Sequence, residues 1–296
     1  MKFLKLNLLF LLISGFTYAQ KWEVGKTYTD DEKWTEFIVG DLPLIISVPH
    51  GGTTMLSDVA NRSCKGAVTV TDSKTIELVK EIEKAFLAKY KARPFIIISN
   101  LSRKHVDQNR DLEEGTCGDK AMEKPWHQFH DYIDTAVVLA TKKFGKAIYI
   151  DLHGHGHTKQ RLELGYNLTA EELRNLDSKD SKQVSKSSVI NLLTNDKKLD
   201  LEQLLIGADA FGTLIAKQGF DAVPSKQDVA PLTEDKYFNG GYNTKRYTSI
   251  KYPSIFGFQI ESNFKGVRDA SGRPAFATAF VDAMETYFKT YLKSKF

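Results

Sequence analysis

The chain has 296 residues, a formal net charge of +4, 42% hydrophobic residues and 26% charged residues. This length is sufficient for one large α/β domain or two small ones. The composition is that of an ordinary globular protein, and the positive charge is too small and too dispersed to indicate nucleic-acid binding. Because no dense Lys/Arg run with interleaved aromatic residues occurs, we expect no nucleic-acid partner.

The first nineteen residues have the pattern of a secretory signal peptide. Lys2 and Lys5 form a positive region, residues 6–16 form an apolar segment too short for a membrane anchor, and a small-x-small cleavage site ends at Ala19. No cysteine follows this site, and no later apolar run is long enough to cross a membrane. We therefore expect residues 20–296 to form a single periplasmic or secreted domain that does not contact a membrane.

Cys64 and Cys117 are the only cysteines, and both lie in polar loop sequence. An oxidising compartment permits a disulfide between them, and the alternative is two separate thiols. Neither lies in a CxxC or a Cys/His spacing, which disfavours a structural zinc site.

Four short apolar segments are typical of buried strands: 44–48, 95–99, 147–150 and 255–260. The polar residues that follow them are His50, the loop 100–111, Asp151 with His153, His155 and His157, and Glu261. In an open α/β sheet, ligands and metals collect just beyond the carboxyl ends of strands. Imidazole is the commonest protein metal ligand, and a neighbouring carboxylate such as Asp151 could accept its second ring N–H. The alternatives are a turn-capping histidine at His50 and a flexible Gly-His loop at 153–157.

Apolar residues at helical spacing predict four helices: 73–90, 125–144, 201–217 and 274–293. Asp72 is a natural N-cap for the first helix, although a carboxylate at the mouth of a site could also be a ligand. We expect His127 and His130, on the second helix, to be exposed or half-buried.

Residues 158–200 are rich in Lys, Ser and Asp, and we expect them to form a polar excursion over the site, with a capping box at Thr169. In the later loop 238–244, Gly240 and Gly241 bring the backbone close to another part of the molecule. Tyr242 in this loop could donate a hydrogen bond to a substrate or simply cover the core.

Two histidines and a carboxylate, with one position open, form the arrangement of a catalytic zinc site. Such an ion lowers the pKa of its bound water from about 15.7 to about 7. A carboxylate that does not bind the metal is then needed to move the proton from the water to the leaving amine, and Glu261 is the candidate. An arginine near the ion can stabilise an oxyanion, and a second arginine can hold a substrate carboxylate.

Six short motifs recur in the same order in a known family: 49–52, 72–75, 102–110, 151–153, 240–247 and 259–261. In these motifs the chain resembles the N-formylglutamate amidohydrolases, which are distant relatives of the zinc carboxypeptidases and aspartoacylases. The resemblance extends from about His50 to Glu261, which is most of the mature chain.

The resemblance implies an α/β fold of three layers, α/β/α, with a mixed central sheet like that of the zinc carboxypeptidases (phosphorylase/hydrolase-like). It also implies one Zn²⁺ ion, with His50 and His153 as ligands and Asp72 as the third. The carboxypeptidases take their carboxylate ligand three residues after the first histidine. Here that residue is Thr53, so Glu77 is the fallback for Asp72.

The other roles that the resemblance implies concern catalysis and substrate binding. Glu261 is the base and acid, Arg103 polarises the carbonyl group, and Asn109 with Arg110 binds the substrate α-carboxylate. His155 and His157 are additional to the family pattern, and they could line the pocket or bind a second ion.

An export signal does not fit a substrate that arises in cytoplasmic histidine breakdown. We therefore expect an exported zinc amidohydrolase that acts on a small N-acyl amino acid or a short peptide. The alternative is a non-catalytic exported metal-binding protein that uses His153, His155 and His157. A serine hydrolase and a helical zincin are disfavoured because neither Gly-x-Ser-x-Gly nor HExxH occurs.

Overall fold

The computed structural model describes residues 20–293, and the predicted signal peptide lies outside this range. The described chain forms one eight-stranded sheet in the order β1-β2-β4-β3-β5-β8-β6-β7. Its strands are β1 (Thr27–Thr29), β2 (Thr35–Ile38), β3 (Leu44–Val48), β4 (Phe95–Ser99), β5 (Ala147–Gly154), β6 (Leu162–Gly165), β7 (Ala222–Val223) and β8 (Ile255–Ser262). Strands β4, β3, β5 and β8 are parallel, whereas β2 and β6 run antiparallel to their neighbours β4 and β8. This mixed sheet confirms the predicted class.

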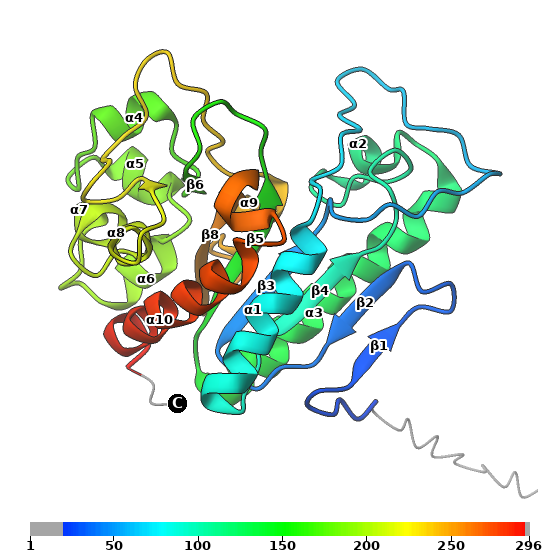
Figure 1. The fold of residues 1–296 in the computed structure, drawn as a ribbon, viewed down its shortest axis with the longest axis horizontal. Coiled ribbons are helices and arrows are strands. Elements are labelled where there is room, and N and C mark those ends of the chain that lie inside the picture. The colour runs from blue at the N-terminus through cyan, green and yellow to red at the C-terminus, as the bar shows by residue number, and fades with distance from the viewer. Residues whose placement is uncertain (1–19, 294–296) are drawn as a thin grey trace, which may run out of the picture.

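Helices cover both faces of the sheet, so the fold has three layers (Figure 1). The helices are α1 (Thr75–Tyr90), α2 (Leu112–Thr116), α3 (Glu123–Phe144), α4 (Ala170–Arg174), α5 (Ser181–Lys186), α6 (Ile190–Asn195), α7 (Leu201–Ile206), α8 (Phe211–Lys217), α9 (Tyr242–Tyr247) and α10 (Arg273–Tyr291), with short turns η1 (Lys120–Met122) and η2 (Phe264–Arg268). Helices α1 and α10 pack on one face, and α3 packs on the other.

The central strands are apolar on both faces because both faces are covered. Ile46 and Ile98 lie in the core formed with α1 and α10, whereas their neighbours Ile45 and Ile97 lie in the core formed with α3. Successive side chains of a strand point to opposite faces, so a continuous apolar segment supplies both cores. This is the reason why the sequence predicted β3 and β4 with the observed bounds.

Strand β5 is longer than predicted, because the chain does not leave the sheet at Asp151. Strand β8 pairs with it in parallel along its whole length, from Ala147 opposite Ile255 to Gly154 opposite Ser262. His153 therefore lies within a strand, where pairing on the β8 side fixes its backbone.

The final helix and α3 agree with the predicted ranges within two residues, and the observed C-cap of α3 is Gly145 as expected. The expectation for His130 is wrong, since this side chain is only 1% exposed, although His127 is exposed. His130 Nδ1 lies 2.7 Å from the hydroxyl of Tyr247, so burial leaves this nitrogen with a partner.

The predicted helix 201–217 is divided into α7 and α8. The chain leaves the helix at Gly207, which has extended backbone angles, and re-enters it after Ala210. Glycine has a low helix propensity, and the apolar spacing alone did not reveal this break. The buried residues of both short helices still face the same core.

The polar segment 158–200 is not simply an excursion over the site. It contributes β6 to the sheet, and Figure 1 shows α4, α5 and α6 grouped beside that edge. The capping box at Thr169 is present at the start of α4. Asn191 is buried, and its Nδ2 donates to main-chain carbonyls that include those of Thr248 and Ile255. Part of the polar sequence therefore supports the approach to β8.

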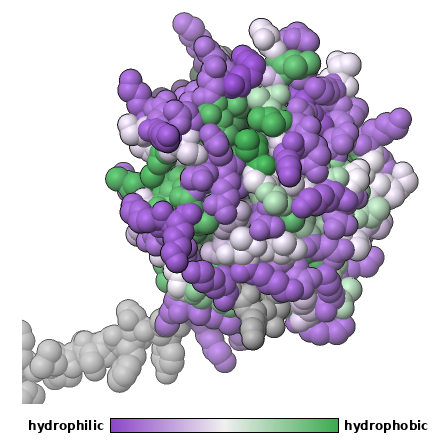
Figure 2. Space-filling view, turned by 90° about the vertical axis from the view of Figure 1, so that its left-hand side faces the viewer, coloured by the Kyte–Doolittle hydropathy of each residue, from purple (hydrophilic) through white to green (hydrophobic). Residues whose placement is uncertain are grey.

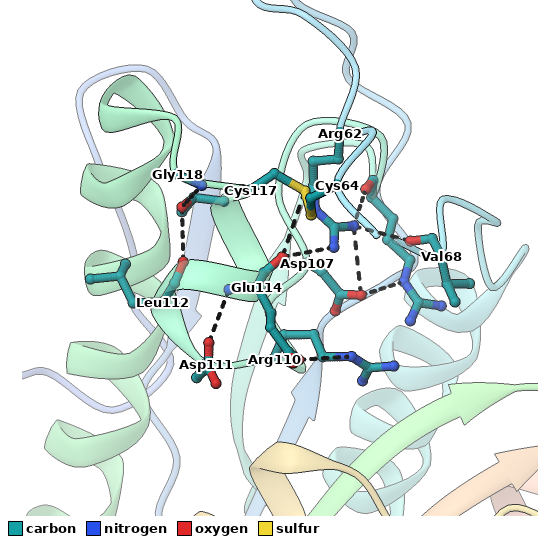
Figure 3. Close-up of a disulfide and its surroundings, with 12 residues drawn as sticks. Arg62, Cys64, Val68, Asp107, Arg110, Asp111, Leu112, Glu114, Cys117 and Gly118 are labelled. Carbon is teal, nitrogen blue, oxygen red and sulfur yellow. Dashed lines mark hydrogen bonds and ion pairs between the residues drawn. A yellow bond between two sulfur atoms is a disulfide. The ribbon is translucent and has the colours of Figure 1, made fainter. Parts of the chain in front are cut away.

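Cys64 and Cys117 form a disulfide, which was one of the two arrangements that the sequence left open (Figure 3). Within residues 20–293, no helix has the length and apolar character needed to cross a membrane. Figure 2 views the molecule from the left-hand side of Figure 1; hydrophilic side chains cover most of this face, and hydrophobic ones gather in small patches.

Candidate metal centre

Three of the predicted site residues lie at the carboxyl ends of three neighbouring parallel strands. His50 follows β3, His153 lies near the end of β5, and Glu261 lies near the end of β8. His153 and Glu261 are register partners, and β3 is the other neighbour of β5. The carboxyl ends of parallel strands meet at the same edge, so residues about 100 positions apart become neighbours.

Asp72 joins this group from the loop before α1, and it is not the N-cap of that helix. The N-cap is Lys74, which has a left-handed backbone with φ of 70° and no side-chain cap bond. Thr75 Oγ1 donates to the main-chain oxygen of Asp72, so the backbone of Asp72 takes part in the helix start while its carboxylate faces the histidines. Glu77, the fallback ligand, instead forms an exposed ion pair with Lys74.

The three predicted ligands converge on one point. Asp72 Oδ2 lies 3.0 Å from Nδ1 of His153 and 3.6 Å from Nδ1 of His50. The two imidazole rings have centroids 4.8 Å apart, and one ligand atom from each of the three residues lies within 4.8 Å of the others. All three side chains are buried.

The Nδ1 atom of each histidine faces Asp72, and its Nε2 atom contacts a second carboxylate. His153 Nε2 lies 2.8 Å from Asp151 Oδ2, and His50 Nε2 lies 2.7 Å from Asp107 Oδ1. A carboxylate in this position fixes the ring and directs the opposite nitrogen toward an ion. Both Nδ1 atoms therefore face Asp72.

The carboxylates of Asp151 and Asp107, which contact the histidines, are themselves held in place by further polar groups. Asp151 Oδ1 accepts from the Ser47 hydroxyl at 2.6 Å and from Asn243 Nδ2 at 3.3 Å. Asp107 Oδ2 accepts from Arg103 Nε at 2.9 Å. These contacts orient the histidines through their partners.

The electrostatics of the group are those of a cation site. Burial alone would raise the pKa of the Asp72 and Asp107 carboxyls. The adjacent His153 and His50 instead lower the pKa of Asp72 below the usual range, and His50 together with Arg103 lowers that of Asp107. Burial alone would lower the pKa of His153, but Asp151 and Asp72 raise it well above the ordinary value for histidine. The site thus favours positive charge between its carboxylates.

The residues present fit a divalent ion such as Zn²⁺. His50 Nδ1 is buried and has no hydrogen-bond partner among the described residues, and it faces the Asp72 carboxylate. Buried polar atoms usually have a partner, and buried negative charge needs compensation. Two imidazole nitrogens and one carboxylate oxygen are a ligand set that zinc accepts. The donors available to an ion are therefore His50, Asp72 and His153.

Glu261 stands beside this group and is not one of its three donors. Glu261 is only 6% exposed, and Gln259 Nε2 donates to its Oε1 at 2.8 Å. Burial raises the pKa of Glu261 to about 8, with His153 opposing the shift and Asp72 adding to it. A carboxyl with this pKa can exchange a proton near neutral pH.

A cavity of about 380 Å³ lies over these groups. It is lined by His50, Val68, Val70, Asp72, Arg103, Asn109, Arg110, His153, Gly154, His155, Gly156, His157, Phe238, Gly240, Gly241, Gln259 and Glu261. Seven of the eight predicted site residues line it; the eighth, Tyr242, does not. The cavity has room for a small molecule and contains both acidic and basic side chains.

The loop after β4 supplies the basic side of the cavity. Arg103 is buried and anchored through its Nε to Asp107. Arg110 is half-buried, and its Nη1 donates to the main-chain oxygen of Asn109 at 2.8 Å. Both guanidinium groups therefore have fixed positions at the cavity wall.

The amide of Asn109 is already engaged within the protein. Its Oδ1 accepts from the main-chain nitrogen of Asn243 at 2.8 Å, and its Nδ2 lies 3.2 Å from His153 Nε2. Gly241 allows this contact, because a Cβ at that position would overlap the Asn109 side chain. The contacts favour a positioning role for Asn109, and its predicted contact with substrate stays a prediction.

Tyr242 is the first residue of α9, a helix that the sequence did not predict. The side chain packs near Trp126, and its hydroxyl accepts from Arg246 Nη1 at 3.2 Å. It covers the core, which was one of its two expected roles, and a contact with substrate stays a prediction.

The three alternating histidines belong to two different groups. His153 faces His50 and Asp72, whereas His155 and His157 lie with Glu163. His155 Nε2 contacts the main-chain oxygen of Arg161 at 2.9 Å, and its Nδ1 accepts from the main-chain nitrogen of His157. Both nitrogens of His155 are thus engaged. The alternative site built from His153, His155 and His157 is not the arrangement that the structure contains.

Asp107 is the main site residue to which the sequence analysis gave no role. It lies in the same loop as Arg103 and Asn109, after β4, so its position at a strand end was a usable signal. Asn243, which donates to Asp151 and to Asn109, gave no such signal because its position depends on how α9 packs.

No family model and no curated protein matches this sequence. Among solved structures, the chain is similar to an N-formylglutamate amidohydrolase from Ralstonia eutropha JMP134, with 13% identity over 86% of this chain and 96% of that one, at a TM-score of 0.49. It is also similar to a protein from Agrobacterium tumefaciens (10% identity, 83% and 91% covered, TM-score 0.44). A third is the succinylglutamate desuccinylase from Chromobacterium violaceum (12% identity, 83% and 63% covered, TM-score 0.33).

The first of these structures carries the name of the family that the sequence motifs resemble. At these identities and TM-scores the likeness assigns no role to any residue of this chain. The chemistry of the site is therefore inferred from its own side chains.

We expect the purified mature chain to bind one zinc ion, and His50→Ala or His153→Ala to lose it because each removes a donor. His157→Ala should keep the ion, since His157 belongs to the other group. Metal analysis after dialysis against zinc-containing buffer checks this, with the exposed His127→Ala as control and circular dichroism to confirm folding. Two ions in the wild type that fall to one in His157→Ala would contradict the assignment.

Proposed function

We propose that the protein is an exported zinc-dependent amidohydrolase that cleaves the amide bond of N-acyl amino acids or short peptides. One observation carries the proposal. The buried group His50, Asp72 and His153, with an unpartnered Nδ1 on His50, lies beside a separate carboxyl, Glu261, whose pKa is raised toward neutrality. Water activation and proton transfer require these two features side by side.

Zinc, when bound, supplies Lewis acidity, which makes water a competent nucleophile near neutral pH. In its ionised form, Glu261 accepts the proton of the attacking water at a carboxylate oxygen. The protonated carboxyl then donates that proton to the nitrogen of the leaving amine as the C–N bond breaks. A pKa near 8 suits both steps, because the group must take up and release a proton in one cycle.

Arg103 is assigned to the carbonyl oxygen of the scissile amide. Its bond to Asp107 holds the guanidinium at the cavity wall. A donor already fixed in place stabilises the negative charge that develops on this oxygen, without reorganisation during the reaction.

Arg110 is assigned to the α-carboxylate of the substrate, because an arginine can bind a carboxylate through two parallel hydrogen bonds. The basic side of the cavity, formed by Arg103 and Arg110, supports an anionic small molecule. The signal-peptide pattern supports a periplasmic or secreted location. N-formylglutamate arises in the cytoplasm, so an exported enzyme is not restricted to substrates with a formyl group.

Replacing Glu261 by Gln should lower kcat by about 10²–10⁴-fold, because the amide cannot accept the proton of water. Zinc content should stay at the wild-type value, since Glu261 is not one of the three donors. Hydrolysis of N-formyl- and N-acetylglutamate, measured together with metal content, checks both statements. Turnover that survives the substitution would exclude Glu261 as the base.

The rate should fall as pH falls, because only ionised Glu261 accepts a proton. Since burial raises the folded-state pKa above the ordinary 4.5, the acidic limb of kcat/KM should lie above pH 4.5, and a bound cation would keep it at or below pH 8. Gln259→Ala should move this limb to higher pH, since it removes a donor to the carboxylate. A limb at pH 4.5 in both proteins would contradict the assignment.

Masking the α-carboxylate of an N-acyl amino acid as an amide should lower kcat/KM by about 10–100-fold, because a charge-assisted contact with Arg110 is lost. In Arg110→Ala the acid and the amide should be hydrolysed at similar rates. Parallel assays of the two substrates with the two proteins give this comparison. Equal rates for both substrates in the wild type would remove the role of Arg110.

A further inference from the structure

Apolar side chains gather at the cavity above the polar site. Among residues 20–293, ten large hydrophobic side chains are exposed, and three of these line this one cavity. They are Val68, Val70 and Phe238, with exposed fractions of 41%, 70% and 44%. Isolated exposed apolar residues are common, but three around one small cavity indicate a surface that an apolar group covers.

The loop that carries Val68 and Val70 is held by covalent and ionic contacts. The Cys64–Cys117 disulfide joins it to the end of α2, and Arg62 is buried beneath it (Figure 3). Arg62 Nη1 donates to the main-chain oxygen of Val68 at 3.0 Å, and its Nη2 donates to that of Glu114 at 3.0 Å. The backbone of Val68 is thus fixed by a buried guanidinium group.

The same arginine connects this loop with the metal centre. Arg62 Nη1 lies 3.7 Å from Asp107 Oδ2, and it donates to the main-chain oxygen of Arg103 at 3.1 Å. Asp107 in turn holds His50. The side chains of Val68 and Val70 contribute little to the core because they remain exposed, so their own burial does not explain why this loop is anchored.

Phe238 is also held by a buried charged side chain, Glu163, which lies on the opposite side of the central strands from Arg62. Its main-chain nitrogen donates to Glu163 Oε2 at 2.8 Å, and its ring stacks on His157 with centroids 4.7 Å apart. Glu163 Oε1 also lies 2.7 Å from His157 Nδ1. Glu163 belongs to β6, whereas Arg62 contacts the loop after β4, and β3, β5 and β8 lie between these two strands in the sheet.

We propose that Val68, Val70 and Phe238 form an apolar wall that binds an aliphatic group of the substrate. The inference rests on the proposed function, since it assigns the class of substrate that the same site takes. Such a group is either the acyl chain or the side chain of the N-acyl amino acid. A formyl group has no aliphatic carbon to place against this wall, so a longer aliphatic group should bind more tightly, by about fourfold for each methylene buried.

Binding to the zinc-loaded mature Glu261→Gln protein tests this wall without turnover. One series varies the acyl group on glutamate (formyl, acetyl, butyryl, hexanoyl), and the other varies the side chain of N-acetylated alanine, valine and leucine. We expect the dissociation constant, measured by calorimetry, to fall by about fourfold per methylene along one series. The series that responds identifies which end of the substrate meets the wall.

Adding Val68→Ser and Val70→Ser should remove most of the dependence on chain length in the series that responds. Val138→Ser is the matched control, because Val138 is 62% exposed on α3 and does not line the cavity. Replacing both Cys64 and Cys117 by Ser should weaken the dependence as well, with zinc content unchanged. If that variant fails to fold, the valine variant still decides the question.

The outcomes separate the two proposals. Affinity that does not change along either series, or a dependence that survives the valine substitutions, overturns the apolar wall even if the wild type hydrolyses N-formylglutamate. A dependence on chain length that the valine substitutions remove supports the wall. It does so even if the wild type shows no hydrolysis, a result that would overturn the amidohydrolase proposal alone.

Discussion

The structure depends on the burial of several carboxylates beside two imidazoles at one edge of the sheet. Asp72, Asp107, Asp151 and Glu261 are all nearly excluded from solvent there. Such charges are costly to bury unless positive groups or an ion compensate them. The parallel strands β3, β5 and β8 bring these groups together, and the hydrogen bonds around them leave both Nδ1 atoms directed at Asp72. These residues could hold a divalent ion, which would compensate the buried negative charge.

Two groups of similar composition therefore have different roles. In the first, His50 has a buried nitrogen without a partner, and each histidine is backed by its own carboxylate. In the second, His155 uses both nitrogens within the protein, and Glu163 holds His157 together with the backbone of Phe238. The first group could therefore bind an ion, whereas the second holds Phe238 in position at the apolar wall of the cavity. Residue types alone do not separate these roles, because the difference lies in which ring nitrogens are already engaged.

The chemistry and the selectivity of the proposed enzyme come from different parts of the chain. Strand ends supply the donors and the proton-transfer carboxyl, and these positions are rigid because both faces of the sheet are packed. Loops supply the surfaces that a substrate would meet, and Arg62 and the disulfide fix one of them. Asp107 links the two parts, since it contacts His50 and Arg103 at the centre and also Arg62, which holds this loop. A change of loop sequence could thus alter the substrate while the donors stay in place.

The sequence by itself determined the central strands, the two longest helices and the strand-end residues of the centre. Strand segments 44–48 and 95–99 were predicted with their observed bounds, because a continuous apolar run between polar breaks has few alternatives. His50, His153 and Glu261 were found because ligands collect at strand ends. Only the tertiary structure decided that Asp72 faces the histidines instead of capping α1, that Asp107 backs His50, and that His155 and His157 belong to a second group. Those outcomes depend on side-chain directions and on contacts between segments far apart in the chain, and local sequence patterns do not encode either.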